Sequence, residues 1–579
     1  MARPNERPST AWAEAACLLA GALTPLAFHT LGTIGFEATK AVVVRLLALV
    51  LVLGWLAGRI GEFAAGAHDG EPSRALDLGG AAGRPFALVL VGLVVSLALS
   101  TSLSIQPLVS LLGSWDRVQG TATVLSWLVL GIAAALAGRD PAARRTLTTA
   151  WLVASLPVSL YALVQLAQLD PLAWLNRPLG ATSTLGSSTA LATYLAMLLP
   201  LSLARAVEAG RALTARPVDA ACSDPGRHGR RVDRHRKQSV PFWNDGTAYA
   251  LAFWAGLLVL QVAGLVAAQV RGGLLGAAAG LAVAGVVVLW RLRPAWRRPA
   301  LTAAIVLTLG AGIVLIGGAL GDGSVETDST GQRLLIWRAT LETIAAGGWR
   351  ALLGFGPETQ AVALEPRFPI ELATRFEDLR FDRAHNFLLD TLLTTGLVGG
   401  VLLVALGGLV IRAGLRATAS QDIGEGILAA GLLGSLAAYV AANSVAFDSN
   451  VTSVLGAMIA GLLVAPSLPV PARATALPRR RKTPADARPL VPIARLRVTG
   501  WLAAAAVGAS LLPWLIAPLL ADLYHTRALA MRAAEAPASS VIPEREAARW
   551  APWQDVPLLA MALAYLDIAR TTSDATGPV

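Results

Sequence analysis

The chain has 579 residues, of which 55% are hydrophobic and only 15% charged, and its formal net charge is +11. Soluble domains carry about 25% charged residues, so this composition excludes a set of soluble domains and indicates a protein embedded in lipid. The two cysteines, Cys17 and Cys222, lie in different surroundings, and no CxxC or HExxH pattern is present. We therefore expect no disulfide framework, no metal site and no cofactor.

Thirteen apolar runs are suited to cross a membrane, because a helical span needs about 20 mostly apolar residues. The first contains Pro25 and is followed directly by another, so we expect a retained span and not a signal peptide. The sequence thus predicts an all-α polytopic membrane protein of about 13 transmembrane helices. The runs lie near 12–32, 41–57, 86–101, 120–138, 147–167, 186–204, 247–270, 273–290, 300–318, 387–410, 425–443, 449–465 and 498–519.

Basic residues predict the orientation of these spans. If the N-terminus is cytoplasmic, the inside segments contain 31 Lys and Arg, whereas the short outside connections contain four, namely Lys40, Arg117, Arg177 and Arg271. Short cytoplasmic loops carry an excess of positive charge in membrane proteins. We therefore predict a cytoplasmic N-terminus, an extracytoplasmic C-terminus and a large extracytoplasmic loop over 319–385, between spans nine and ten.

The chain divides by composition. Residues 1–465 form the predicted membrane domain, 466–497 a basic cytoplasmic linker, 498–519 an additional span and 520–579 an extracytoplasmic tail. The tail predicts two alanine-rich amphipathic helices that faintly resemble a tetratricopeptide-type hairpin. One such pair cannot bury its own apolar face, so the tail either packs on the membrane domain or is a remnant.

A second basic segment, Arg227–Lys237, lies in an inside connection. A role in binding lipid headgroups or nucleic acid is the less favoured interpretation. We interpret the segment as a loop that fixes topology, and we expect no nucleic-acid partner.

The polar residues argue against a transporter or ion pump. Such proteins place ionisable side chains at mid-membrane, whereas these runs contain chiefly Glu14, His29 and Arg45, scattered near span ends. Polar side chains gather instead in the segments predicted to face outward. These are Arg271, Arg333, Arg338, Asp382, Arg383, His385 and Asp390.

Arginines in these segments are candidate anion ligands. Arg271 lies between two nearly continuous spans, where it either snorkels to headgroups or binds a phosphate in a bidentate manner. Arg333 falls in the first turn of a helix predicted over Ser329–Ile344, which we expect to lie along the membrane surface. Arg338 and Glu342 are spaced as an i,i+4 ion pair, which favours a structural role for Arg338.

Two further features surround the next span. Gly354 and Gly356 allow a close approach of the backbone. His385 precedes the span at 387–410, and an imidazole at the membrane–water boundary is suited to act as a general base. A lone interfacial histidine more often has no role, and the spacing does not decide whether Asp382 or Asp390 would orient it.

Together these elements resemble the O-antigen ligase and O-antigen polymerase superfamily. The likeness covers most of residues 86–465 and rests on the order of five segments. These are Leu103–Gly120, Arg177–Leu201, Gln269–Gly276, Gly331–Thr359 and Ala384–Gly400. The resemblance implies a bacterial plasma-membrane enzyme that moves a glycan from a polyprenyl diphosphate carrier to an acceptor hydroxyl, without a metal.

By this resemblance, Arg271 and Arg333 would bind the diphosphate and His385 would deprotonate the acceptor for an inverting attack. Arg338, Asp382, Asn386 and Asp390 are candidate supporting residues. The chain departs from many relatives at Thr394-Thr395, where an acidic residue often precedes the glycine.

Four other functions stay open. The chain could be a polymerase or a protein O-glycosyltransferase of the same superfamily, or, less favoured, a small-anion transporter. A scaffold that presents the tail to a partner is the remaining class.

Overall fold

The computed structural model describes residues 8–64, 83–172, 180–214, 246–292, 329–375, 382–469, 493–534 and 536–575, with the single positions 295, 299 and 302. Over these residues the protein consists of helices, without a strand. Ten of the described helices are long and apolar enough to cross a membrane, and two shorter apolar helices accompany them. The prediction of an all-α polytopic membrane protein is confirmed for this part of the chain.

The membrane helices follow the predicted runs in order. The ninth predicted span, 300–318, lies outside the described residues, so the total of about 13 stays a prediction. The first helix ends at Leu23, whereas the predicted run extended to residue 32. The proline ring of Pro25 disfavours the helical conformation at the preceding residue, Thr24. The bounds are α1 (Pro8–Leu23), α2 (Glu37–Ala64), α3 (Arg84–Ser102), α5 (Thr121–Ala137), α6 (Pro141–Leu166), α7 (Ser188–Thr214), α8 (Gly246–Ala267), α9 (Arg271–Leu292), α15 (Phe387–Thr418), α16 (Ile423–Asn443), α17 (Asn450–Val464) and α18 (Ile493–Ala533).

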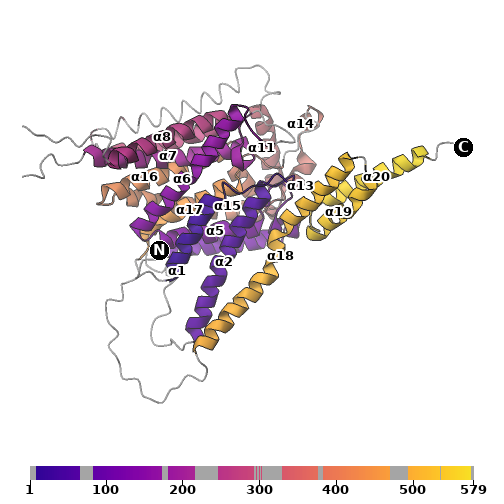
Figure 1. The fold of residues 1–579 in the computed structure, drawn as a ribbon, viewed down its shortest axis with the longest axis horizontal. Coiled ribbons are helices and arrows are strands. Elements are labelled where there is room, and N and C mark those ends of the chain that lie inside the picture. The colour runs from indigo at the N-terminus through magenta and orange to yellow at the C-terminus, as the bar shows by residue number, and fades with distance from the viewer. Residues whose placement is uncertain are drawn as a thin grey trace, which may run out of the picture.

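Shorter helices gather at the end of the bundle far from the N-terminus, which we call the site end (Figure 1). The helix predicted over Ser329–Ile344 is observed there as α11. The site-end helices are α4 (Pro107–Leu112), α11 (Ser329–Ala346), α12 (Arg350–Leu353), α13 (Gln360–Leu364), α14 (Ile370–Arg375), α19 (Pro537–Trp550) and α20 (Val556–Ala575). The 3-10 helices are Ser183–Leu185, Glu365–Arg367 and Ala465–Ser467.

The bundle is packed as a membrane protein, with large apolar side chains on its surface. Leu88, Val259 and Val404 are 74%, 68% and 64% exposed, as side chains that face lipid would be. Inside, small residues let helices α7, α9 and α16 approach closely. A Cβ atom added to Gly280 of α9 would lie 2.7 Å from the carbonyl oxygen of Gly434 of α16. This close contact is typical of helix packing in lipid.

The tail differs from the prediction in its helix boundaries. Helix α18 is continuous from the last span into the tail, so the predicted span 498–519 and the first tail helix form one element of 41 residues. Pro513 and Pro518 lie inside it, and membrane helices tolerate such prolines. Helix α19 was not predicted, because Pro537 and Pro543 resemble loop signals; yet a proline suits the first turn of a helix.

The tail packs on the membrane domain. Helix α18 lies along α2, and α19 and α20 follow it at the site end (Figure 1). The carboxylate of Asp522 accepts hydrogen bonds from the backbone N–H groups of Thr33 and Ile34, in the connection between α1 and α2, at 2.8 and 3.2 Å. Of the two alternatives left open by the sequence, packing on the membrane domain is therefore the one observed.

Candidate functional site

The segment that carries His385 is held in a fixed conformation at the start of α15. The side chain of Asn386 caps the helix by accepting hydrogen bonds from the N–H groups of Leu388 and Leu389. Asp390, one turn later, accepts from the N–H of Ala384 at 2.9 Å. His385 itself has φ of 54°, a left-handed conformation that non-glycine residues rarely adopt. Such strain persists when surrounding contacts fix the chain, and it concentrates at functional sites.

A buried ionic network around Arg383 anchors this segment. Its guanidinium pairs with Glu358 and, at 3.1 Å, with Asp448, and it donates to the Gln119 side chain at 2.9 Å. Burial by itself lowers the pKa of Arg383, but the two carboxylates outweigh this effect and raise it. Leaving this buried charge unpaired would be costly, so the three partners of Arg383 hold it firmly in place. The network thereby ties three distant chain segments to Arg383, two residues before His385.

Arg117 holds the other side of the segment. It forms two hydrogen bonds with the carboxylate of Asp382, at 2.7 and 3.2 Å. Its guanidinium also lies 3.8 Å from the ring centroid of Phe447, and that ring contacts the imidazole of His385 edge-on at 5.1 Å. A bidentate arginine is geometrically specific, so these contacts restrict where the imidazole can lie.

The surroundings keep the imidazole of His385 neutral. Burial lowers its pKa to about 4. The positive charges of Arg333, Arg117 and Arg383 also lower it, whereas the negative charge of Asp382 raises it. Burial raises the pKa of Asp382, but the charge and hydrogen bonds of Arg117 outweigh it, so its pKa is lowered overall. At neutral pH an unprotonated imidazole therefore lies next to an ionised carboxylate, which is the protonation state that a general base requires.

Helix α15 is broken where a glycine-containing loop docks against it. Gly396 has φ of 68°, which interrupts the helix, and the N–H groups of Phe355 and Gly356 donate to the carbonyls of Leu393 and Thr394 at 2.9 and 3.0 Å. This docking places Glu358, two residues beyond Gly356, where it pairs with Arg383. The close backbone approach expected of the glycines is observed.

The predicted phosphate ligands lie on two other helices. Arg333, in the first turns of α11, is near enough for its charge to lower the pKa of His385. On the same helix, the Trp337 indole donates to the carbonyl of Ala384 at 2.8 Å, so α11 is fastened to the histidine segment. Trp337 is thus a partner of the histidine segment.

Arg271 is the first residue of α9, and its exposed side chain has no ion pair or hydrogen bond with any described residue. The neighbouring Gly272 lies against Val445, with 3.2 Å between an added Cβ and the valine methyl group. Val445 precedes Phe447 by two residues. The structure therefore places Arg271 and His385 beside the same connection between α16 and α17.

Arg338 is not part of this cluster of contacts. It is 79% exposed and pairs with Glu342 at 2.8 Å, as the i,i+4 spacing predicts. Solvent screens an exposed pair of this kind, so it contributes little to stability.

Several residues of the site were not assigned a role from the sequence. Arg117 was counted among the outward-facing basic residues, and Glu358 lies in the segment Gly331–Thr359 that carries the family resemblance. Their partners lie too far away in the sequence for residue spacing to reveal them. The signal was present in their position within segments shared with the resembled family. Phe447 and Asp448, between α16 and α17, belong to no motif that predicts a role in the site.

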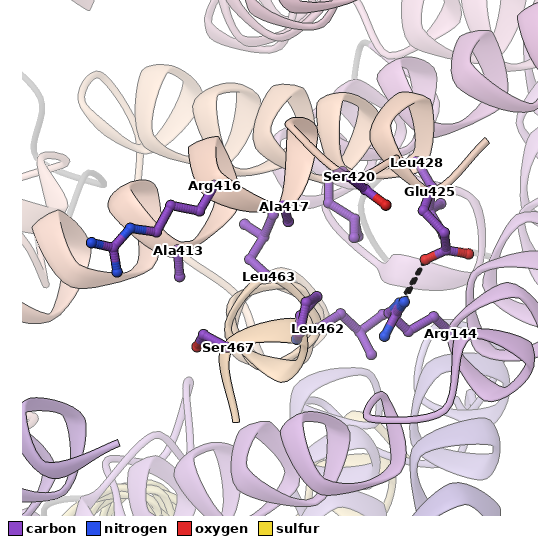
Figure 2. Close-up of a pocket in the computed structure, with 13 residues that line it drawn as sticks. Arg144, Ala413, Arg416, Ala417, Ser420, Glu425, Leu428, Leu462, Leu463 and Ser467 are labelled. Atoms are coloured by element: carbon purple, nitrogen blue, oxygen red, sulfur yellow. Dashed lines mark hydrogen bonds and ion pairs between the residues drawn. The ribbon is translucent and has the colours of Figure 1, made fainter. Parts of the chain in front are cut away.

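A cavity at the opposite end of α15 is not the candidate site. It has a volume of about 420 Å³ and contains none of the predicted site residues (Figure 2). Arg144 in its wall pairs with Glu425 at 2.5 Å. The other lining residues are mostly apolar, and they are Ala413, Arg416, Ala417, Ser420, Leu428, Ala429, Leu432, Leu462, Leu463, Pro466 and Ser467.

Comparison with known proteins relates part of the chain to a known family. Residues 256–404 match the family model described as O-antigen ligase. The matched segment is less than half of the chain, and it contains Arg271, Arg333 and His385. No curated protein matches the chain. The family match confirms the resemblance that the sequence motifs indicated.

Proposed function

We propose that this multi-pass membrane protein with an O-antigen ligase domain transfers an oligo- or polysaccharide from a polyprenyl diphosphate to an acceptor hydroxyl. The reaction would take place at the outer face of the bacterial plasma membrane, in the orientation that the charge distribution predicts. The observation that carries the proposal is the neutral, strained His385, flanked by Arg333 within the matched segment.

The proposed chemistry divides between a base and two cations. His385 accepts the proton of the acceptor hydroxyl, whose oxygen attacks the anomeric carbon from the side opposite the diphosphate, with inversion. Arg271 and Arg333 bind the diphosphate and stabilise the negative charge that develops as it leaves. Such a displacement needs positioning, a base and fixed positive charge, so we propose a metal-independent transfer.

The supporting residues act through His385. Asp382, fixed by Arg117, counters the positive charges around the imidazole, and Asp390 and Asn386 fix the backbone on either side of it. We leave Arg338 outside the proposal, because its guanidinium is already paired on the exposed face of α11.

The test is reconstitution in lipid nanodiscs with a labelled lipid-linked glycan and candidate acceptors. We expect His385→Ala to lower kcat about 10²- to 10⁴-fold, the usual contribution of a general base. Arg271→Gln and Arg333→Gln should weaken donor binding or transfer, and Arg338→Gln on the same helix as Arg333 is the matched control. Full transfer by His385→Ala, or loss of wild-type transfer on adding EDTA, would contradict the mechanism.

The same assay separates the related activities. Product on a lipid acceptor indicates a ligase, product on a growing glycan a polymerase, and product on a polypeptide a protein O-glycosyltransferase. Movement of a small anion across the membrane without any transfer would favour the transporter alternative.

A further inference from the structure

The loop formed by Gly113–Gln119, called the 113–119 loop, contacts each part of the histidine segment. Ser114 donates to Glu358, the partner of Arg383, at 2.5 Å from its hydroxyl. Arg117 binds Asp382, as described above, and Gln119 bonds both Arg383 and, at 3.3 Å, the carbonyl of Asp448. The placement of this loop therefore decides the placement of His385.

The loop is itself strained. Val118 has φ of 54°, a conformation that is a rare outlier for a β-branched residue. Its carbonyl accepts hydrogen bonds from the buried Arg45 at 3.2 Å and from Thr123 at 2.7 Å. A conformation of this kind persists only where the surrounding contacts over-determine it.

The C-terminal helices supply part of those contacts. Trp115 is 6% exposed and packs in one apolar cluster with Val118, Ala521 of α18 and Ala551, which follows α19. Its indole meets the imidazole of His525 edge-on at 5.3 Å.

Two polar contacts fix the same junction. Gln554, which is 5% exposed and lies between α19 and α20, donates to the carbonyl of Gly113 at 2.7 Å. His525 is held in turn by the buried carboxylate of Glu544, at 3.0 Å. The tail thus contacts both ends of the three-residue segment Gly113–Trp115 that begins the loop.

We propose that the C-terminal helices are a positioning element of the site, acting through Trp115 and Gln554 on the 113–119 loop and thereby on the geometry of His385. The tail is then part of the catalytic unit and not an appended module. Its catalytic consequence rests on the proposed function, whereas its effect on His385 can be measured without any substrate.

The substrate-free test measures carbethoxylation of His385 by diethylpyrocarbonate, read by peptide mass spectrometry on the full-length protein in nanodiscs. Only the neutral imidazole reacts, and the ratio of rates at pH 5 and pH 7 cancels differences in access. The wild-type ratio should be near one, because the pKa of His385 is about 4. In Trp115→Ala, the displaced loop admits water, the pKa moves toward about 6.5, and the ratio should fall more than about fivefold.

Matched variants exclude a general loss of folding. Trp115→Phe keeps an aromatic ring at the junction and should restore most of the wild-type ratio. Gln554→Leu removes a single hydrogen bond and should shift the ratio in the same direction as Trp115→Ala. Ile542→Ala, on the part of α19 where the side chain is 71% exposed, should leave the ratio unchanged.

Transfer kinetics supply the second readout. Trp115→Ala should lower kcat about 10- to 100-fold, as misplacement of a catalytic group by about 1 Å does, with a smaller change in the KM for the donor. The KM should change less because the proposed donor ligands, Arg271 and Arg333, lie on α9 and α11. These helices pack on α16 and α15, and neither belongs to the 113–119 loop.

The two proposals can fail separately. If wild-type protein transfers no glycan but the rate ratio shifts as expected, the proposed function fails and the coupling stands. If transfer is observed but Trp115→Ala and Gln554→Leu match Ile542→Ala in both the ratio and kcat, the positioning role is overturned.

Discussion

At the scale of single residues, His385 differs from an ordinary interfacial histidine in its backbone and its charge state. Its left-handed φ and its low pKa both come from its surroundings. Asp390 fixes the preceding peptide, and burial, together with the nearby arginines, disfavours the imidazolium. An exposed histidine would titrate near pH 6.5 and would be half protonated in mildly acid conditions. The structure instead keeps the base form available over a wider range.

The pH dependence of transfer follows from this environment. A base must be neutral to accept a proton, and burial lowers the pKa of His385 to about 4, so kcat/KM should stay level from pH 7.5 to about 5 and fall only below that. In the proposed reaction, a diphosphate bound beside the imidazole adds negative charge and raises its pKa, so the acid limb of kcat should lie at higher pH. Steady-state rates across pH 4–8 test both limbs; a limb of kcat/KM near pH 6.5 would contradict this account.

At the scale of elements, the site depends on a loop that docks into the break in α15. The break frees the carbonyls of Leu393 and Thr394, and the N–H groups of Phe355 and Gly356 satisfy them. Buried backbone groups need such partners, so the break and the loop stabilise each other. The same docking brings Glu358 to Arg383.

Gly354→Ala should therefore disrupt the site from a distance. Gly354 has φ of 84°, and an added Cβ would lie 1.9 Å from the carbonyl oxygen of Thr394, so the loop must move or the backbone must strain. We expect a loss of stability of about 1–3 kcal/mol, together with reduced transfer. Thermal unfolding in detergent and the nanodisc assay measure the two effects.

Gly407→Ala is the matched control for that substitution. Gly407 lies in α15, and an added Cβ would meet no atom within 4 Å. Alanine favours a helix interior over glycine by roughly 1 kcal/mol, so the unfolding midpoint should hold or rise. Equal destabilisation by the two substitutions would show that the docked loop is not important.

At the scale of the whole molecule, the two ends of the bundle carry different chemistry. The site end contains α11, which carries Arg333, and the C-terminal helices α19 and α20 (Figure 1). His385 is fastened to α11 through the bond from Trp337 to Ala384. The opposite end contains Arg416 and the ion pair of Arg144 with Glu425 (Figure 2). Which end faces the cytoplasm is a prediction from the charge distribution, and under the proposed function it decides which leaflet supplies the donor lipid.

Cysteine labelling tests the orientation. In a Cys222→Ser background, where the remaining Cys17 is buried, Glu342→Cys should react with a membrane-impermeant maleimide in intact cells. Arg416→Cys, at the far end of α15, should react only after permeabilisation. Both side chains are exposed, so access within the protein does not distinguish them. The reverse pattern would overturn the predicted topology and the proposed outer-face reaction.

The sequence by itself determined the features that depend on local composition. A span is recognised from about 20 successive apolar residues, so twelve of the predicted runs correspond to described helices, and α11 was recognised from the spacing of its apolar residues. The resemblance also selected Arg271, Arg333 and His385. The boundaries failed where local signals conflict with tertiary contacts, as in α19, whose prolines resemble a loop although its Glu544 is buried against His525.

Only the tertiary structure decided what surrounds the candidate base, His385. Arg383 bonds Gln119 across 264 residues of sequence, and the tail reaches the 113–119 loop through Trp115. Charge interaction and burial depend on distance in space, and helix packing sets that distance, so spacing along the chain cannot reveal it. The sequence therefore named the candidate base, whereas packing between distant segments determined its conformation, its protonation state and the elements that hold it.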